Sequence, residues 1–138
     1  MIRYLLDTNV ISELRKTKPD GAVVAWMRTL LPEQIFISAV TIGELQAGVE
    51  LTRKTDAAKA AEIESWLSAL GNSFAVLPMD PAGFRELARL KTGKSSKLVE
   101  DAMIGATARV HGPQVATRNE ADFQRLGVAS FNPFQFAP

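Results

Sequence analysis

Five short apolar runs alternate along the chain with longer segments that have helical character. The runs cover residues 2–6, 35–38, 74–79, 113–117 and 128–131 and are short enough to be buried strands. Helices are predicted between them, at residues 8–15, 20–31, 39–53, 56–70, 81–91, 97–110 and 119–126. Residues that commonly cap helices precede or begin many of these segments, namely Asp20, Ser38, Asp56, Asp80 and Asn119. Alternating strands and helices predict an α/β fold with a mostly parallel sheet of about five strands and helices on both faces.

Composition narrows the class of protein further. The 138 residues contain no repeat and no linker rich in glycine or proline, so residues 1–138 are expected to form a single domain. No run approaches the roughly 20 apolar residues of a membrane span, and no signal peptide is recognisable, so we expect a cytoplasmic protein without a membrane partner. The absence of cysteine excludes a disulfide framework, a thiolate nucleophile and cysteine-bound zinc.

Charge gives only a local indication of a partner. The net charge is +1, so bulk electrostatics do not predict nucleic-acid binding. The stretch from Arg85 to Lys97, however, carries five cations and a single anion, Glu86. It is either a solvated helix end or a track for phosphate groups, and the charge pattern alone does not decide between them.

Two acids follow the first two predicted strands. Asp7 ends the first apolar run, where it can serve a site or simply cap the next helix. Glu44 lies in the helix after the second strand, and its neighbours four residues away are Val40 and Gly48. A capping box formed by Thr41 and Glu44 is the alternative, although Ser38 is the earlier cap.

Two further acids lie in the second half of the chain. Between residues 98 and 108 the only polar side chains are Glu100, Asp101 and Thr107, so this helix is predicted to be buried and its inward acid needs a partner. Periodicity does not decide whether Glu100 or Asp101 faces inward. Asp122 follows the fourth predicted strand, where it either joins a site or forms a capping box with Asn119.

These acids are expected to meet at one edge of the sheet, because the carboxyl ends of parallel strands lie together there. Two charges 4 Å apart repel by about 4 kcal/mol at an effective dielectric constant near 20. Several carboxylates in one cleft therefore raise their pKa values or bind a divalent cation, and a site built only from oxygen ligands suits Mg²⁺ or Mn²⁺. Such sites promote the transfer of phosphoryl groups to water.

Other chemistries lack their motifs. The chain has no phosphate-binding loop, dinucleotide fingerprint or nucleophile elbow. Its only histidine, His111, precedes Gly112 and Pro113 and is predicted to be a surface residue in a loop. A Mg²⁺-dependent phosphatase that uses Asp7 is one alternative, but the DTN motif lacks the second aspartate of such enzymes. A non-catalytic partner-binding module is another.

The chain resembles PIN-domain ribonucleases, specifically VapC/FitB-like toxins of type II toxin–antitoxin pairs. The resemblance lies in five motifs that occur in the family's order: LLDTNVISEL (5–14), TIGELQAGVE (41–50), DAMIGATA (101–108), ATRNEADF (116–123) and FNPF (131–134). It implies a PIN-like three-layer α/β/α fold. It also implies metal-binding and catalytic roles for Asp7, Glu44, Asp101 and Asp122, favours Asp101 over Glu100, and places Asn9 and Thr117 beside the acids.

The resemblance further implies a function and partners. The implied function is that of a Mg²⁺- or Mn²⁺-dependent endoribonuclease that acts on structured RNA such as tRNA and leaves 5′-phosphate and 3′-hydroxyl ends. The expected assembly is a homodimer, becoming a heterotetramer or larger with a VapB/FitA-like antitoxin, through which alone DNA would be contacted. The stretch from Arg85 to Lys97 then becomes a candidate RNA contact. An apolar groove for the antitoxin is expected to draw on Trp26, Met27, Leu51, Trp66 and Leu67.

Overall fold

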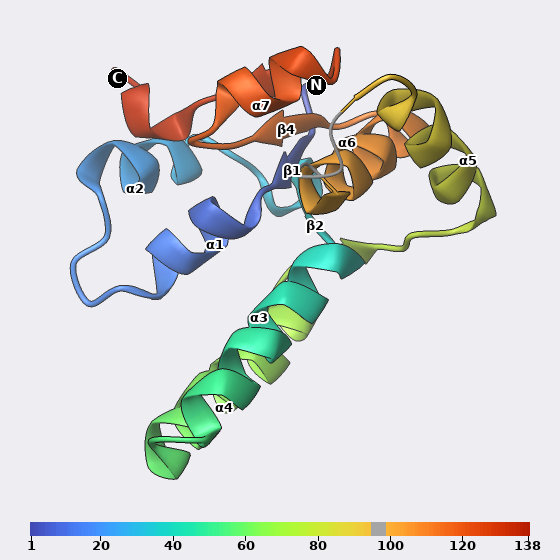
Figure 1. Ribbon diagram of the computed structural model, residues 1–138. Helices are drawn as coiled ribbons and strands as arrows, with labels where there is room; N and C mark the ends of the chain where they lie inside the picture. Colours follow the sequence, from blue (N-terminus) through green and yellow to red (C-terminus); the bar gives the residue numbers. More distant parts are fainter. Residues whose placement is uncertain (95–98) are drawn as a thin grey trace.

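A five-stranded parallel sheet forms the centre of the protein, as a computed structural model of residues 1–94 and 99–138 shows (Figure 1). Its strands are β1 (Tyr4–Leu6), β2 (Ile35–Ser38), β3 (Ala75–Leu77), β4 (Gln114–Ala116) and β5 (Ser130–Phe131). They lie in the order β3-β2-β1-β4-β5, and every pair is parallel. The predicted fold class is therefore confirmed, with β1 at the centre between β2 and β4.

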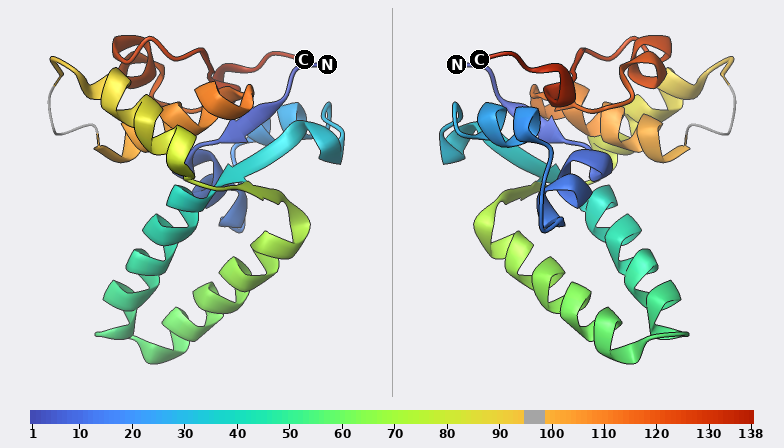
Figure 2. Two further views of the ribbon diagram at one scale, coloured as in Figure 1. Left: turned by 90° about the vertical axis from the view of Figure 1, so that its right-hand side faces the viewer. Right: turned by 90° about the vertical axis from the view of Figure 1, so that its left-hand side faces the viewer.

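Helices cover both faces of this sheet. One side carries α1 (Thr8–Arg15), α2 (Gly21–Met27), α3 (Ala39–Arg53) and α4 (Ala57–Ser73). The other carries α5 (Pro81–Lys91), α6 (Val99–His111) and α7 (Glu120–Arg125). Two short 3₁₀ helices, η1 (Pro32–Gln34) and η3 (Pro133–Gln135), complete the described elements. Helices α3 and α4 pack as an antiparallel hairpin that projects well beyond the sheet (Figure 2).

Alternate residues of each central strand enter different cores. Leu5 packs with α5, α6 and α7, whereas Leu6 packs with α1 and α2 on the opposite face, and neither side chain is exposed. Val115 and Ala116 of β4 divide in the same way. Because successive side chains of a strand point to opposite faces, a sheet covered on both sides needs apolar residues at every position. This requirement explains the uninterrupted apolar runs in the sequence.

Local capping explains most helix starts. The side chains of Asp20, Ser38, Asp56 and Asp80 each accept a backbone hydrogen bond from the first turn of the following helix. Asn119 occupies the N-cap position of α7, but its side chain makes no capping hydrogen bond. Asn119 therefore stands at the predicted cap position but does not cap the helix through its side chain.

Three other predictions need comment. The helix expected at residues 20–31 ends at Met27, and Pro32, which begins η1, keeps Leu31 extended. His111 is not in a loop: it is the last residue of α6 and half-buried, with Nε2 3.7 Å from Oδ2 of Asp80. The predicted start of the helix at residues 97–110 lies outside the described residues, as does Lys97.

No helix among residues 1–94 and 99–138 combines the length and the apolar character needed to cross a bilayer.

Candidate active site

The four predicted acids lie on elements that meet at the carboxyl edge of the sheet. Asp7 directly follows the central strand β1, and its backbone N–H donates to the carbonyl of Ala116 at the end of β4 over 2.9 Å. Glu44 is in the second turn of α3, which follows β2, and Asp122 is in α7, beyond β4. Asp101 is in the first turn of α6, which packs against α3 and α7. Topology thus brings together the acids that follow neighbouring strands.

Asp7 is buried and held by three donors. Its Oδ1 accepts the Thr8 N–H over 2.8 Å, and its Oδ2 accepts the hydroxyl of Thr117 over 2.8 Å and the side-chain amide of Asn9 over 3.1 Å. Asp7 is the N-cap residue of α1, as one interpretation predicted, but its second oxygen is bound by side chains. Burial raises the pKa of Asp7 above its ordinary value, against the hydrogen bonds that lower it, and the charge of Asp122 raises it further.

Glu44 is oriented from the neighbouring helix. The hydroxyl of Thr8 donates to its Oε1 over 2.9 Å and shares a second hydrogen bond of 3.0 Å with the buried hydroxyl of Thr41. The N-cap of α3 is Ser38, which accepts the Val40 N–H, so Thr41 and Glu44 are too far into the helix to form a capping box. Partial burial raises the pKa of Glu44 despite the Thr8 hydrogen bond, and nearby carboxylates add to the rise.

Asp101 is the acid whose pKa is raised by the charges of all three other acids. Burial raises its pKa to about 6, and the charges of Asp7, Asp122 and Glu44 contribute in that order, together with a hydrogen bond to Asp122. Glu100 is exposed instead, although its charge is near enough to raise the pKa of Glu44. The ambiguity that periodicity left open is thus resolved in favour of Asp101 as the inward acid.

Asp122 is half-buried and links the site to its own helix. Its Oδ1 accepts a hydrogen bond from Nη1 of Arg125 over 3.1 Å. Its N–H bonds the carbonyl of Asn119 over 3.2 Å, but Asn119 makes no side-chain cap, so the alternative capping box does not form. The carboxyl of Asp122 instead approaches Asp101.

These residues fit a hard divalent cation in the chemistry of their donors. All four ligand candidates are carboxylates, and the pKa values of Asp7, Glu44 and Asp101 are raised by burial and in part by the charges of neighbouring carboxylates, which a cation would offset. In the described part of the chain, however, no three acidic or histidine side chains are already close enough to hold an ion. Binding therefore requires side-chain adjustment toward the ion.

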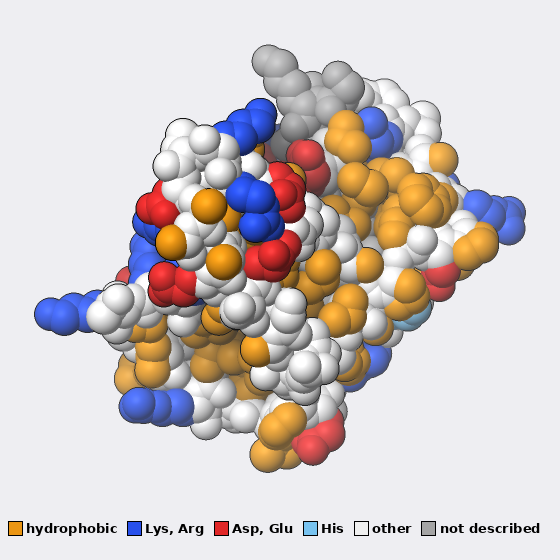
Figure 3. Space-filling model, turned by 90° about the horizontal axis from the view of Figure 1, so that it is seen from below, with side chains coloured by type: hydrophobic (Ala, Val, Ile, Leu, Met, Phe, Trp, Pro, Cys, Tyr) orange, Lys and Arg blue, Asp and Glu red, His pale blue; other side chains and the backbone are white. Residues whose placement is uncertain are grey.

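An apolar hollow adjoins Glu44. It has a volume of about 440 Å³ and lies between α3, α5 and α6, with walls formed by Ala39, Val40, Gly43, Ala47, Met79, Phe84 and Met103 and with Glu44 and Glu100 beside them. Figure 3 shows hydrophobic side chains gathered next to the α3–α4 hairpin on the α5 side. Phe84 is 54% exposed there. Sequence reasoning missed this hollow, because its walls come from separate segments.

The groove expected from the helices at 20–31 and 39–70 is only partly present. Trp26 and Leu67 belong to the core, whereas Leu51 is 65% exposed. Trp66 lines a separate hollow of about 260 Å³ together with Ile11, Leu14, Ala69, Leu70, Ser73 and Phe74.

The cationic stretch begins on α5. Arg85, Arg89 and Lys91 lie on this helix and Lys94 follows it, whereas Lys97 lies outside the described residues. Nη1 of Arg89 is 3.0 Å from Oε2 of Glu86, so one of these cations is already paired within the helix.

Thr8 is the clearest residue of the site that sequence reasoning missed. It lies between Asp7 and Asn9 and binds both Glu44 and Thr41 through its hydroxyl. Its position in the DTN motif was visible, but nothing in that motif indicates a contact with residues 41 and 44.

Two relatives align with nearly the whole chain. VapC ribonuclease Y4jK of Sinorhizobium fredii is 37% identical, over 95% of this chain and 97% of the relative. Toxin FitB of Neisseria gonorrhoeae is 36% identical, over 94% of this chain and 97% of the relative. The crystal structure of FitAcB from Neisseria gonorrhoeae matches with a TM-score of 0.86 at 35% identity, covering 96% of this chain and 99% of the matched chain.

The family model for the PIN domain matches residues 4–129, which include all four acids. The resemblance inferred from the sequence motifs is confirmed by this match and by the VapC and FitB relatives. Ribonucleases of this family generally depend on a divalent metal. On these grounds the chain belongs to the PIN-domain family.

Proposed function

We propose that this protein is the endoribonuclease toxin of a type II toxin–antitoxin pair and that Asp7, Glu44, Asp101 and Asp122 form its Mg²⁺ or Mn²⁺ site. The observation that supports the assignment best is the meeting of these acids at the carboxyl edge of the sheet, where Asp7 is buried and Asp122 hydrogen-bonds Asp101. Burial and the charges of the other three acids raise the pKa of Asp101 to about 6, so these carboxylates repel one another. Repulsion of this kind costs stability unless a cation relieves it, so the arrangement has a function other than stability.

The protein's residues would act by holding carboxylates in place. The donors on Asp7 fix both of its oxygens, and Thr8 fixes Glu44, which leaves their remaining lone pairs for the ion. Such supporting hydrogen bonds orient metal ligands and tune their basicity. A bound Mg²⁺ or Mn²⁺ would supply charge stabilisation at the phosphodiester and a more acidic water. Hydrolysis would then leave 5′-phosphate and 3′-hydroxyl ends without a protein nucleophile.

The substrate in this proposal is structured RNA, such as tRNA. The relatives named as ribonucleases support the substrate class. The exposed cations Arg85 and Lys94, on and after α5, offer phosphate contacts, and Arg85 directly follows Phe84 of the apolar hollow. Contacts of this type set affinity and salt dependence and carry no sequence preference.

A cognate VapB/FitA-like antitoxin is the proposed protein partner, with a homodimer as the basic unit. Solved structures that share the fold come from toxin–antitoxin complexes, some with bound DNA. The hollow beside Glu44 joins apolar walls to an acidic end. A peptide with apolar side chains and an arginine matches this surface, because arginine pairs bidentately with carboxylates and replaces the cation.

The decisive experiment compares three aspartate variants. Purified wild type, Asp7→Asn and Asp101→Asn are incubated with RNA and Mg²⁺ or Mn²⁺, and the cut ends are mapped. Asp56→Asn is the matched control, because Asp56 is an exposed N-cap that asparagine replaces well. We expect cleavage by wild type and the control only, with all variants folded. Metal-dependent cleavage by both site variants at the wild-type rate would refute the assignment.

The phosphatase alternative is disfavoured by two contacts. Both oxygens of Asp7 already accept hydrogen bonds, and Asn9, at the position where such an enzyme has its second aspartate, donates to Asp7 and carries no proton-transferring carboxyl. Trapping a phosphorylated Asp7 would nevertheless revive it. A non-catalytic module would show no stabilisation by Mg²⁺ and no RNA cleavage.

A further inference from the structure

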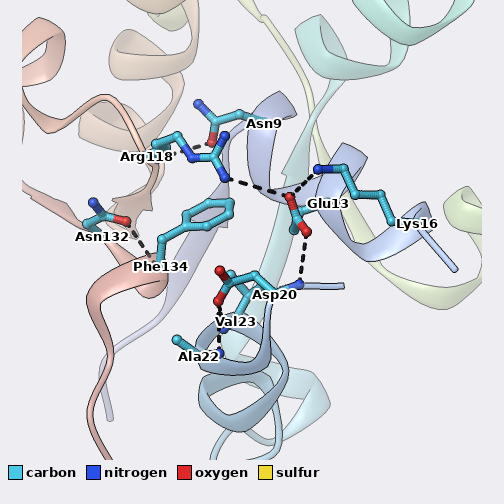
Figure 4. A network of polar contacts seen from close by, with 9 residues as sticks. All are labelled: Asn9, Glu13, Lys16, Asp20, Ala22, Val23, Arg118, Asn132 and Phe134. Atoms are coloured by element: carbon cyan, nitrogen blue, oxygen red, sulfur yellow. Dashed lines mark hydrogen bonds and ion pairs between the residues drawn. The ribbon is translucent and has the colours of Figure 1, made fainter. Parts of the chain in front are cut away.

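The side chain of Arg118 joins two distant segments just beyond β4. Its guanidinium carbon lies 3.9 Å from the centroid of the Phe134 ring, and its Nη2 is 3.7 Å from Oε1 of Glu13 (Figure 4). Phe134 is itself fixed in η3, where its N–H donates to Oδ1 of Asn132 over 3.0 Å. A planar guanidinium suits both an aromatic face and a carboxylate. Arg118 is thus held by α1 on one side and by the C-terminal segment on the other.

Glu13 is the anchor of this contact. Its side chain is only 6% exposed, yet Oε1 accepts a hydrogen bond from Lys16 and Oε2 accepts the N–H of Asp20, each over 2.9 Å. These two hydrogen bonds, followed by the charges of Lys16 and Arg118, hold the pKa of Glu13 below its ordinary value. Glu13 is therefore ionised at neutral pH and ties the end of α1 to the start of α2 and to Arg118.

The backbone of the same arginine reaches the acidic site. The N–H of Arg118 donates to Oδ1 of Asn9 over 3.2 Å, and this bond turns the amide nitrogen of Asn9 toward Asp7. The preceding residue, Thr117, donates its hydroxyl to Oδ2 of Asp7 and accepts the N–H of Asn119 over 2.9 Å. Both side-chain donors to Asp7 thus depend on where the backbone of residues 117–118 lies.

We propose that Arg118 is a positioning residue, whose stack on Phe134 and ion pair with Glu13 hold the connection between β4 and α7 so that Thr117 and Asn9 orient Asp7. The side chain is 53% exposed, which would also suit a contact with an RNA phosphate. Its guanidinium, however, is directed to Glu13 and Phe134 (Figure 4). This inference rests on the proposed function of Asp7.

The test compares Arg118→Ala and Arg118→Lys with Arg53→Ala. Arg53 is the matched control, since it also pairs with carboxylates, at 2.9 Å from Glu50 and 3.0 Å from Glu64, but lies at the far end of α3. Losing a residue that supports a metal ligand costs about 10- to 100-fold in activity or metal affinity. We expect Arg118→Ala to lower kcat about 10-fold with KM nearly unchanged and to weaken Mn²⁺ binding, measured by calorimetry, by a similar factor.

Two comparisons make the result specific. Arg118→Lys keeps the charge but loses the planar stack, so we expect partial rescue. Adding Arg118→Ala to Thr117→Val should cost less than the sum of the two single losses, because part of the arginine's effect passes through that hydroxyl. If Arg118→Ala raised KM and left kcat and Mn²⁺ affinity unchanged, the arginine would be a phosphate contact instead. Additive losses in the double variant with Thr117→Val would also overturn the proposal. So would losses in Arg118→Ala that only equal those of Arg53→Ala. A wild type that binds Mn²⁺ but cuts no RNA would refute the proposed function and leave the binding comparison intact.

Discussion

Replacing Asp101 by asparagine should stabilise the metal-free protein at neutral pH. Burial and three neighbouring acids raise the pKa of Asp101 from 3.8 to about 6 in the folded protein. Since the folded state then binds the proton more tightly than the unfolded chain, the ionised carboxylate destabilises the fold. That cost is absent below about pH 4, grows as the pH rises, and is complete above about pH 6.

The magnitude follows from the pKa difference. A rise of about two pKa units corresponds to about 3 kcal/mol at 1.36 kcal/mol per unit, and partial exposure of Asp101 to water reduces this to about 1.5 kcal/mol. Asp101 is also in the first turn of α6, where a negative charge is favourable by about 0.5 kcal/mol. Asparagine loses that benefit, so the net gain is about 1 kcal/mol, or about 3–4 °C in Tm for a domain of this size.

The assay is thermal unfolding of wild type, Asp101→Asn and the control Asp56→Asn in chelator, at intervals from pH 3.5 to pH 8. The quantity of interest is the difference in Tm between Asp101→Asn and wild type. We expect this difference to be near zero at the acidic end and to level off above pH 6. A difference that is negative at neutral pH, or the same at every pH, would show that the acids do not repel one another as the structure indicates.

Three further predictions concern the metal, the support of Glu44 and the start of α5. Mg²⁺ at 100 times its Kd should stabilise wild type by about 2.7 kcal/mol in thermal unfolding, whereas Asp7→Asn should gain little; equal gains would place the ion elsewhere. Thr8→Val should weaken Mn²⁺ binding about 10-fold in calorimetry, with Thr8→Ser close to wild type; equal affinity in both would deny the Thr8–Glu44 contact a role. Asp80→Ala should destabilise the protein by about 1 kcal/mol in urea, because the Gly83 N–H loses its 2.8 Å cap, and an unchanged midpoint would contradict this.

Capping residues and the alternation of strands and helices were sufficient to predict most of the fold from the sequence. The helix at residues 81–91 was predicted with its observed bounds, because Asp80 caps it and Pro81 opens it. The positions of Asp7, Glu44 and Asp122 after strands were also readable, since parallel topology follows from alternating strands and helices. The choice between Glu100 and Asp101 was not readable, because it depends on how α6 faces α3 and α7.

The supporting contacts were beyond local patterns for the same reason. Glu13 is a polar residue of an amphipathic helix, yet it is buried by partners at the start of α2 and in the segment after β4. Arg118 reads as an ordinary surface cation in sequence, although it bridges Glu13 and Phe134. Contacts between side chains so far apart along the chain depend on tertiary packing and leave no periodicity to detect.

The central position of β1 also affects the stage of synthesis at which the proposed active site is complete. Tyr4 to Leu6 pair with β4, which begins only at Gln114, and the last proposed ligand is Asp122. During synthesis the chain emerges from its N-terminus onward, and a domain folds as a unit. A ribosome must therefore translate most of the message before Asp7 acquires the hydroxyl of Thr117 and the carboxylate of Asp122. On the proposed function, a chain that ends before Asp122 lacks one of its metal ligands, so we expect it to leave RNA uncut.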